Sequence, residues 1–210
     1  MKAFIYTGGN IAPDNITEQP KAGELRIAAD GGYNNAKALG VHIDVLLGDL
    51  DSLSDTRDVP KETEIIKVKP EKDFTDTQLA VETAIERGAD DIVIIGGLSG
   101  RLDHTLSNLS ILEDLWARRV HAVIADGNNR VRFIDSTSTL IAKSGYRYVS
   151  ILLASDVAKG VSVEGCKYPL TNAKLERRFQ YAVSNEITGN CALISLRKGS
   201  VYIVESRDTH

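Results

Sequence analysis

The stretch Gly48-Asp49-Leu50-Asp51-Ser52 follows directly on an apolar run, Ile43-Asp44-Val45-Leu46-Leu47. That run has the length and composition of a buried strand. Asp49 and Asp51 are therefore expected at a strand end, where an extended chain projects both carboxylates to the same side. Two negative charges this close are tolerated where a cation lies between them or where water screens them. Taken alone, an Asp-x-Asp pair is more often a solvated acidic turn than a metal site.

The first half of the chain alternates between strand-like and helix-like segments. Thr75 is a good N-cap for the second of the helices, whose apolar residues recur at helical spacing as far as Gly88. This alternation predicts a parallel sheet covered by helices on both faces. Strands are expected over 3–6, 25–29, 43–47, 64–68, 91–95 and 121–125, and helices over 33–39, 75–88 and 104–116.

After Asp126-Gly127-Asn128-Asn129 the sequence changes to short β-rich segments separated by turn residues. Such a series is typical of a small antiparallel sandwich or barrel. The predicted fold class is α/β, with an N-terminal parallel-sheet α/β domain over residues 1–126 and a small C-terminal all-β sandwich domain over residues 127–210. The C-terminal strands are expected over 131–134, 137–142, 146–153, 157–163, 191–196 and 201–204.

Acidic residues follow several of the predicted strands of the first domain. The carboxyl ends of parallel strands share one edge, where ligands bind, so these side chains should converge there. Crowded carboxylates need cations, because unit charges a few Å apart repel by roughly 4 kcal/mol at an intermediate dielectric. Oxygen ligands of this kind suit Mg²⁺ held together with substrate phosphates. The acids are Asp30, Asp49, Asp51, Asp73, Asp76 and Asp103.

Glycines accompany these acids in Gly8-Gly9, Gly31-Gly32, Gly48 and Gly96-Gly97 with Gly100. Glycine lets backbone N–H groups approach a phosphate chain closely, although tight turns after strands also need glycine. Arg101 could bind phosphate oxygens through its fork of donors, and Lys72 could face phosphate or water. The residues alone thus predict a site for Mg²⁺ and a polyphosphate.

Composition narrows the class of protein. Hydrophobic residues make up 42% and charged residues 26% of the chain, as in ordinary globular proteins. The net charge of −4 argues against a broad nucleic-acid surface. No apolar segment reaches membrane-spanning length, and the apolar run at the N-terminus is too short for a signal peptide. Cys166 and Cys191 lie in no metal-ligand spacing and read as reduced thiols, so we expect a cytoplasmic protein without a membrane or nucleic-acid partner.

Ordered motifs along the chain resemble those of the thiamine pyrophosphokinase (thiamine diphosphokinase) family, particularly its bacterial members. Gly165-Cys166-Lys167-Tyr168-Pro169-Leu170 and Val183-Ser184-Asn185-Glu186 are similar to the thiamine-side motifs of that family's second domain. The motifs of the first half are Ala29-Asp30-Gly31-Gly32, Gly48-Asp49-Leu50-Asp51-Ser52, Lys72-Asp73-Phe74-Thr75-Asp76 and Gly96-Gly97-Leu98-Ser99-Gly100-Arg101-Leu102-Asp103-His104.

The resemblance implies an enzyme that transfers the terminal pyrophosphoryl group of ATP to the hydroxyl of thiamine, giving thiamine diphosphate and AMP. It implies Mg²⁺, ATP as co-substrate, in-line attack on the β-phosphorus, and a homodimer with active sites at the subunit interface. By motif, the catalytic acids would be Asp49, Asp51, Asp76 and Asp103, the metal ligands Asp49, Asp51 and Asp76, and the substrate-binding residues Asp30, Gly31, Lys72, Asp73, Thr75, Gly97, Arg101, Ser184 and Asn185.

One feature departs from the family pattern. Some members place a tryptophan against thiamine late in the chain, whereas this chain has no tryptophan after Trp116. Tyr168 and Tyr181 are alternatives, and either could equally pack on a sheet. Two other functions also stay open: a different Mg²⁺-dependent phosphotransferase or nucleotide hydrolase, and a non-catalytic module that binds thiamine or a nucleotide.

Overall fold

The computed structural model describes residues 1–48, 59–68 and 74–208 of the chain. Asp49, Asp51, Lys72 and Asp73 therefore lie outside the described residues. The chain divides into two compact units, Met1–Gly127 and Asn128–His210. Each unit is built around its own buried side chains.

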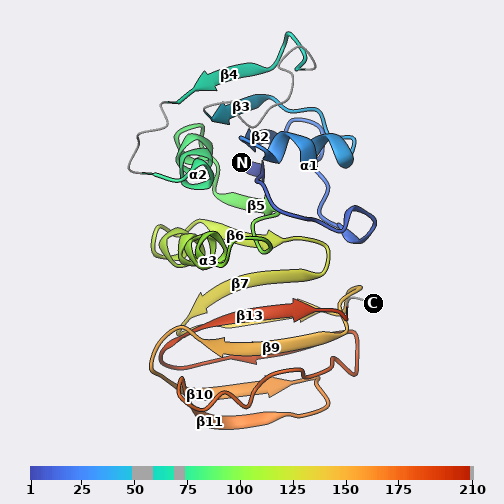
Figure 1. Ribbon diagram of the computed structural model, residues 1–210. Coiled ribbons are helices and arrows are strands. Elements are labelled where there is room, and N and C mark those ends of the chain that lie inside the picture. Colours follow the sequence, from blue (N-terminus) through green and yellow to red (C-terminus); the bar gives the residue numbers. More distant parts are fainter. Residues whose placement is uncertain (49–58, 69–73, 209–210) are drawn as a thin grey trace. The chain divides into compact units, whose positions relative to one another are not determined.

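The first unit contains a parallel sheet with the strand order β4-β3-β2-β1-β5-β6 (Figure 1). The central strands are apolar and buried over residues 3–6, 27–29, 45–47 and 92–95, because helices cover both of their faces. The strands are β1 (Lys2–Tyr6), β2 (Leu25–Ala29), β3 (Val45–Gly48), β4 (Glu64–Lys67), β5 (Asp91–Ile95) and β6 (His121–Ala125).

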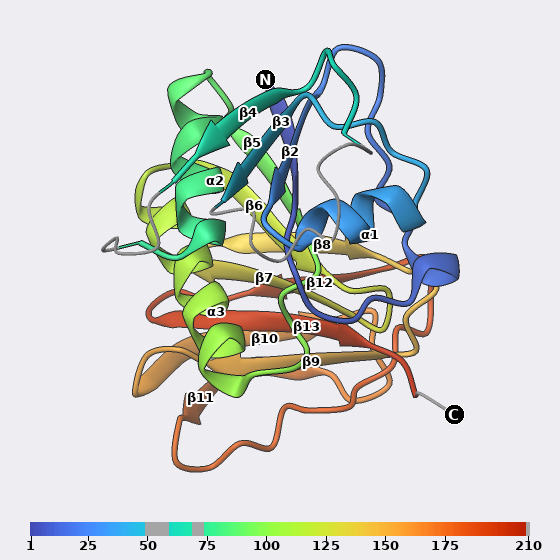
Figure 2. The ribbon, with the colours of Figure 1, turned by 45° about the horizontal axis from the view of Figure 1, so that its top comes forward.

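Helix α1 (Gly32–Ala38) packs on one face of this sheet, and α2 (Asp76–Glu86) and α3 (Leu102–Ala117) pack on the other (Figure 2). Phe4 and Tyr6 of β1 share a buried cluster with Ala36 of α1. Ala3 and Ile5, which alternate with them, are buried outside that cluster and so face the side of α2. The prediction of a sheet covered on both faces is confirmed.

The strand order reverses between β1 and β5. The chain builds β2, β3 and β4 on one side of β1, and then returns through α2 to place β5 on the other side. Crossovers that leave in opposite directions open a gap at the carboxyl ends of the two strands, which is where ligands bind in open α/β sheets. From the topology, a ligand is therefore expected to bind at the loops after β1, β2 and β5.

The start of α1 packs closely on the end of β1. A Cβ built on Gly32 would lie 2.0 Å from the Tyr6 backbone O, whereas a Cβ on Gly31 would meet no atom within 4 Å. We expect Gly32→Ala to lower the free energy of unfolding by about 2 kcal/mol, because the backbone must shift to admit the methyl group. Gly31→Ala, the matched control, should change it by less than about 0.5 kcal/mol. Urea unfolding of both variants measures the difference, and equal values would contradict this packing.

Within the second unit, antiparallel strands pair in two series, in the orders β7-β13-β9 and β11-β10-β12-β8. Burial alternates along β9 and β13, as expected where one face of a sheet lies against the core. The strands are β7 (Asn129–Asp135), β8 (Ser138–Ala142), β9 (Tyr148–Leu153), β10 (Val157–Glu164), β11 (Leu170–Glu176), β12 (Cys191–Ser195) and β13 (Ser200–Ser206).

The core of the second unit includes one buried acid. Glu205 of β13 is 2% exposed. Its carboxylate accepts hydrogen bonds from Arg130 at 2.6 and 2.8 Å, from Arg132 at 2.8 Å and from the Ser144 hydroxyl at 3.3 Å. Arg130 also stacks on the Tyr146 ring, 4.9 Å from its centroid. Two cations and a hydroxyl therefore satisfy the buried carboxylate.

The predicted fold class, α/β with a separate all-β unit, is confirmed. The sequence analysis missed strand β11, which pairs with β10 along its length. Only Leu175 of this strand is fully buried, so its sequence lacks the apolar alternation by which strands are recognised. The sequence analysis also missed the 3-10 turn Pro13–Asn15.

Candidate active site

A crevice of about 420 Å³ opens at the carboxyl edge of the first unit's sheet. Its walls come from the loops after β1, β2 and β5 and from the first turns of α2 and α3. It therefore lies where the strand order reverses. The structure brings together six of the residues that the sequence analysis selected: Asp30, Gly31, Thr75, Asp76, Gly97 and Arg101.

Asp30 lies at the end of β2 in a strained backbone conformation. Its φ is +48°, in the left-handed region that side chains other than glycine rarely adopt. Its N–H donates to Leu47 O at 2.7 Å, and a Cβ on Gly48 would come within 3.2 Å of its Cα. The strand junction thus fixes Asp30 from two sides, and strain of this kind is typical of functional positions.

Asp76 is the first residue of α2. The Thr75 side chain accepts from the Gln78 N–H at 3.2 Å, and the Gln78 side chain accepts from the Thr75 N–H at 3.1 Å. This capping box confirms the prediction that Thr75 begins the helix. The Thr77 hydroxyl also lies 2.8 Å from the Thr7 hydroxyl, which ties α2 to the end of β1. The carboxylate of Asp76 is therefore held on a rigid helix start.

Arg101 and Asp103 form a pair at the start of α3. Arg101 donates from Nε to Asp103 Oδ1 at 3.1 Å and from an Nη atom to Oδ2 at 2.6 Å. The guanidinium lowers the pKa of the Asp103 carboxyl to about 2. Arg101 lines the crevice and Asp103 does not. A carboxylate with so low a pKa accepts protons poorly.

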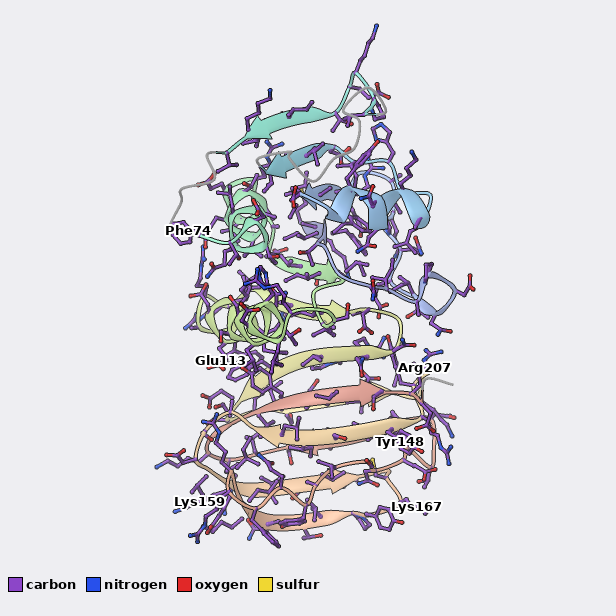
Figure 3. All side chains as sticks on the ribbon, in the orientation of Figure 1. Phe74, Glu113, Tyr148, Lys159, Lys167 and Arg207 are labelled. Carbon is purple, nitrogen blue, oxygen red and sulfur yellow. The ribbon has the colours of Figure 1, made fainter. Side chains whose placement is uncertain are left out.

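His104 and Phe74 are among the crevice residues to which the sequence analysis gave no role. His104 follows Asp103, and its N–H donates to the Asp103 carboxylate at 3.0 Å. Phe74 precedes the cap of α2 and is 54% exposed, with its ring projecting outward (Figure 3). Phe74 stands inside the motif Lys72–Asp76, and that position is the signal that could have selected it.

The described residues show only part of any metal site. Among them, no three His, Cys, Asp or Glu side chains gather closely enough to hold an ion. Asp30 and Asp76 nevertheless line the same crevice. Two carboxylates fit Mg²⁺, which is usually held by one or two carboxylates with water and substrate phosphates. Asp49, Asp51 and Asp73, the other predicted acids, lie outside the described residues.

The second unit has a smaller pocket of its own, of about 100 Å³, with mostly apolar walls. Asn185 lines this pocket, and both polar atoms of its amide bond to the backbone of Tyr168. Asn185 Oδ1 accepts from the Tyr168 N–H at 2.9 Å, and Nδ2 donates to Tyr168 O at 2.7 Å.

Ser184, with φ +55°, is exposed beside the pocket, and its N–H donates to the Ser150 hydroxyl at 2.9 Å. Tyr168 and Tyr181 form part of the wall. Figure 3 places Tyr148 and Lys167 at one end of this unit and Lys159 at the other.

Both units match models of one protein family. The model described as thiamin pyrophosphokinase, catalytic domain, matches residues 18–124, and the model described as thiamin pyrophosphokinase, vitamin B1 binding domain, matches residues 137–201. The chain belongs to the thiamine pyrophosphokinase family. The members of this family are pyrophosphotransferases, and the predicted enzyme class is thereby confirmed.

Similar proteins of known name are also thiamine pyrophosphokinases. The thiamine pyrophosphokinase of Bacillus subtilis strain 168 is 29% identical over 210 residues, which span 97% of this chain and 98% of the relative. A thiamin pyrophosphokinase of Caenorhabditis elegans is 26% identical over 194 residues, spanning 87% and 79%. The crystal structure of the B. subtilis thiamine pyrophosphokinase superposes with a TM-score of 0.89 at 26% identity, over the whole of both chains.

The family models place the two cavities in different domains. The match to the catalytic domain contains Asp30, Asp76 and Arg101, and the match to the vitamin B1 binding domain contains Asn185 and Tyr168. The roles of individual residues remain predictions. No helix in the described part of the chain has the length and apolar character needed to cross a membrane.

Proposed function

We propose that this chain transfers the pyrophosphoryl group of ATP to the hydroxyl of thiamine, in a Mg²⁺-dependent reaction that attacks the β-phosphorus in line. The observation that supports it is the crevice that gathers Asp30, Asp76 and Arg101 at the reversal of strand order. A polyphosphate fits there, because the first turns of α2 and α3 bring the positive ends of two helix dipoles to the crevice.

The bond changes follow from the products. The thiamine oxygen bonds to the β-phosphorus, and the bond from that phosphorus to the oxygen bridging it to the α-phosphorus breaks, so that oxygen leaves with AMP. Phosphoryl transfer needs mainly positioning and charge neutralisation from the protein. Arg101 supplies positive charge to the phosphate oxygens from the start of α3. ATP with ¹⁸O in the α–β bridge should thus yield ¹⁸O-labelled AMP, and label in thiamine diphosphate would contradict attack at the β-phosphorus.

Of the predicted catalytic acids Asp76 and Asp103, Asp76 is the better acceptor for the proton of the thiamine hydroxyl. Asp103 is ion-paired with Arg101 and has a pKa of about 2, whereas Asp76 lines the crevice. Asp30 and Asp76 would hold Mg²⁺ together with the predicted ligands Asp49 and Asp51. The ion would screen the charge of the phosphate chain.

The decisive assay mixes the purified chain with ATP, Mg²⁺ and thiamine and separates the products by chromatography. Thiamine diphosphate and AMP in equal amounts are expected, and EDTA should abolish both. ADP with thiamine monophosphate, or ATP hydrolysis alone, would instead indicate a different phosphotransferase or a hydrolase. Thiamine binding without turnover would indicate a non-catalytic module.

Asn185 should act on thiamine binding through Tyr168. Asn185→Asp removes the donor to Tyr168 O, so the segment beside the pocket loses a hydrogen bond worth about 1 kcal/mol of stability. We expect the KM for thiamine to rise about fivefold and the KM for ATP to stay unchanged. Asn190→Asp, an exposed change in the same unit, is the control. An unchanged KM for thiamine would remove Asn185 and Tyr168 from the binding site.

The predicted homodimer and cytoplasmic location also belong to this proposal. Leu140 of β8 and Leu193 of β12 stand directly opposite each other and are both exposed, so a partner subunit could cover them. Light scattering should give twice the mass of the chain. Cys166 and Cys191 are both free, which fits a reducing compartment.

A further inference from the structure

The loops after β1 and β5 lie against each other along the crevice. Gly97 N–H donates to Gly8 O at 3.1 Å. A Cβ on Gly96 would come within 2.7 Å of Thr7 O, and a Cβ on Gly9 within 3.0 Å of the Ser99 hydroxyl oxygen. Gly9, Gly96 and Gly97 have φ of +96°, +98° and +75°. Only glycine permits both this backbone conformation and this approach.

Side chains behind the loops bond to the loop carbonyls. Asn35 Nδ2 donates to Thr7 O at 2.8 Å and to Gly9 O at 3.0 Å. The Ser99 hydroxyl donates to Asn10 O at 3.0 Å and accepts from the Asn10 N–H at 2.7 Å. Asn108, which is 4% exposed, donates from Nδ2 to Gly97 O at 2.9 Å. With the bond from Gly97, every carbonyl from Thr7 to Asn10 accepts a hydrogen bond.

Unlike the carbonyl groups, several N–H groups of the same loops have no hydrogen-bond partner in the described part of the protein. Within the described part of the chain, the N–H groups of Gly8, Gly9, Ser99 and Gly100 donate no hydrogen bond to the protein. All four residues line the crevice. A loop whose carbonyls are occupied and whose N–H groups are available has the polarity of an anion site.

We propose that Asn35, Ser99 and Asn108 are positioning residues. Through their hydrogen bonds to the loop backbone they hold the two loops in the conformation that keeps the peptide N–H groups available to the phosphate chain of the nucleotide. The inference rests on the proposed function for the identity of the anion. Fixed donors aimed at phosphate oxygens need no reorganisation when the anion arrives.

Ser99 and Asn35 give the cleanest test, because both changes remove hydrogen bonds at exposed or half-buried positions. The probe is inorganic tripolyphosphate with Mg²⁺, measured by calorimetry. We expect Ser99→Ala and Asn35→Ala each to weaken its binding about tenfold, because the loops lose their preorganisation. Ser99→Thr keeps the hydroxyl and should bind within about twofold of the parent chain.

Matched controls lie on α3, which follows the loop of Ser99, and on α1, which contains Asn35. Ser110→Ala in α3 removes a hydroxyl that donates to Leu106 O, away from the crevice, and Asn34→Ala changes the exposed neighbour of Asn35. Both should leave tripolyphosphate binding unchanged. In the proposed reaction, Ser99→Ala should raise the KM for ATP and leave the KM for thiamine unchanged.

Tripolyphosphate binding unaffected by Ser99→Ala and Asn35→Ala would overturn the inference, as would failure of the parent chain to bind it. A Ser99→Thr variant as weak as Ser99→Ala would also overturn it. If the loop variants weaken binding but no thiamine diphosphate forms, the inference stands and the proposed function fails. If thiamine diphosphate forms and the variants bind normally, only the inference fails.

Discussion

Asp76→Asn is expected to lower kcat by about 10³-fold or more while the protein stays folded. The carboxylate stands at the first position of α2 and lines the crevice. Asparagine has nearly the same shape but carries no charge, so it weakens both cation binding and proton acceptance. The capping box of Thr75 and Gln78 does not use the Asp76 side chain, so the helix start should persist. Steady-state kinetics with ATP and thiamine measure the loss.

Glu86→Gln is the matched control, because Glu86 is an exposed acid at the other end of α2. It should leave kcat within about twofold, since single exposed charges outside a site have small effects. Asp30→Asn should act like Asp76→Asn. Asp49→Asn or Asp51→Asn is also expected to abolish transfer, as the sequence motif implies. Normal turnover by Asp76→Asn would exclude this carboxylate from the reaction.

Glu205→Gln is expected to lower the free energy of unfolding by about 3 kcal/mol. The change removes the negative charge of the buried acid that bonds to both Arg130 and Arg132, and so weakens a buried network of charges in the second unit. Breaking one side of a buried ion pair costs 3–5 kcal/mol. We take the lower end, because the arginine side chains are 15% and 25% exposed and water screens them in part.

Glu164→Gln is the control for this prediction, since Glu164 is an exposed acid of the same unit. Its effect on stability should be below about 0.5 kcal/mol. Urea unfolding followed by circular dichroism measures both variants. A Glu205→Gln protein as stable as its parent would show that the charge of Glu205 contributes nothing to the stability of this network.

Local sequence signals predicted the parts of the site that depend on local structure. Thr75 and Gln78 form a cap within four residues, and the structure contains that cap. Asp30 and Asp76 follow different strands, and the rule that parallel strands share a carboxyl edge was enough to bring them into one crevice. The substrates were predicted from the resemblance to thiamine pyrophosphokinases, because the acids and glycines alone could not specify them.

The remaining features depend on contacts between residues far apart in the sequence. Asn35 bonds to carbonyls 26 and 28 residues away, and Ser99 bonds to a residue 89 positions away. No periodicity marks these pairs, so their roles emerge only from the structure. Asn185 is a further case: its motif implied contact with thiamine, which stays a prediction, and the structure adds that its amide bonds to the Tyr168 backbone.

A crystal structure with Mn²⁺ and an ATP analogue whose α–β bridge cannot be cleaved would test the central claim most directly. We predict that the anomalous signal will place a Mn²⁺ ion within coordination distance of phosphate oxygens and of the carboxylate of Asp30 or Asp76. The phosphate chain should lie against the loops after β1 and β5. A phosphate chain bound elsewhere, with both carboxylates away from the metal, would contradict the account.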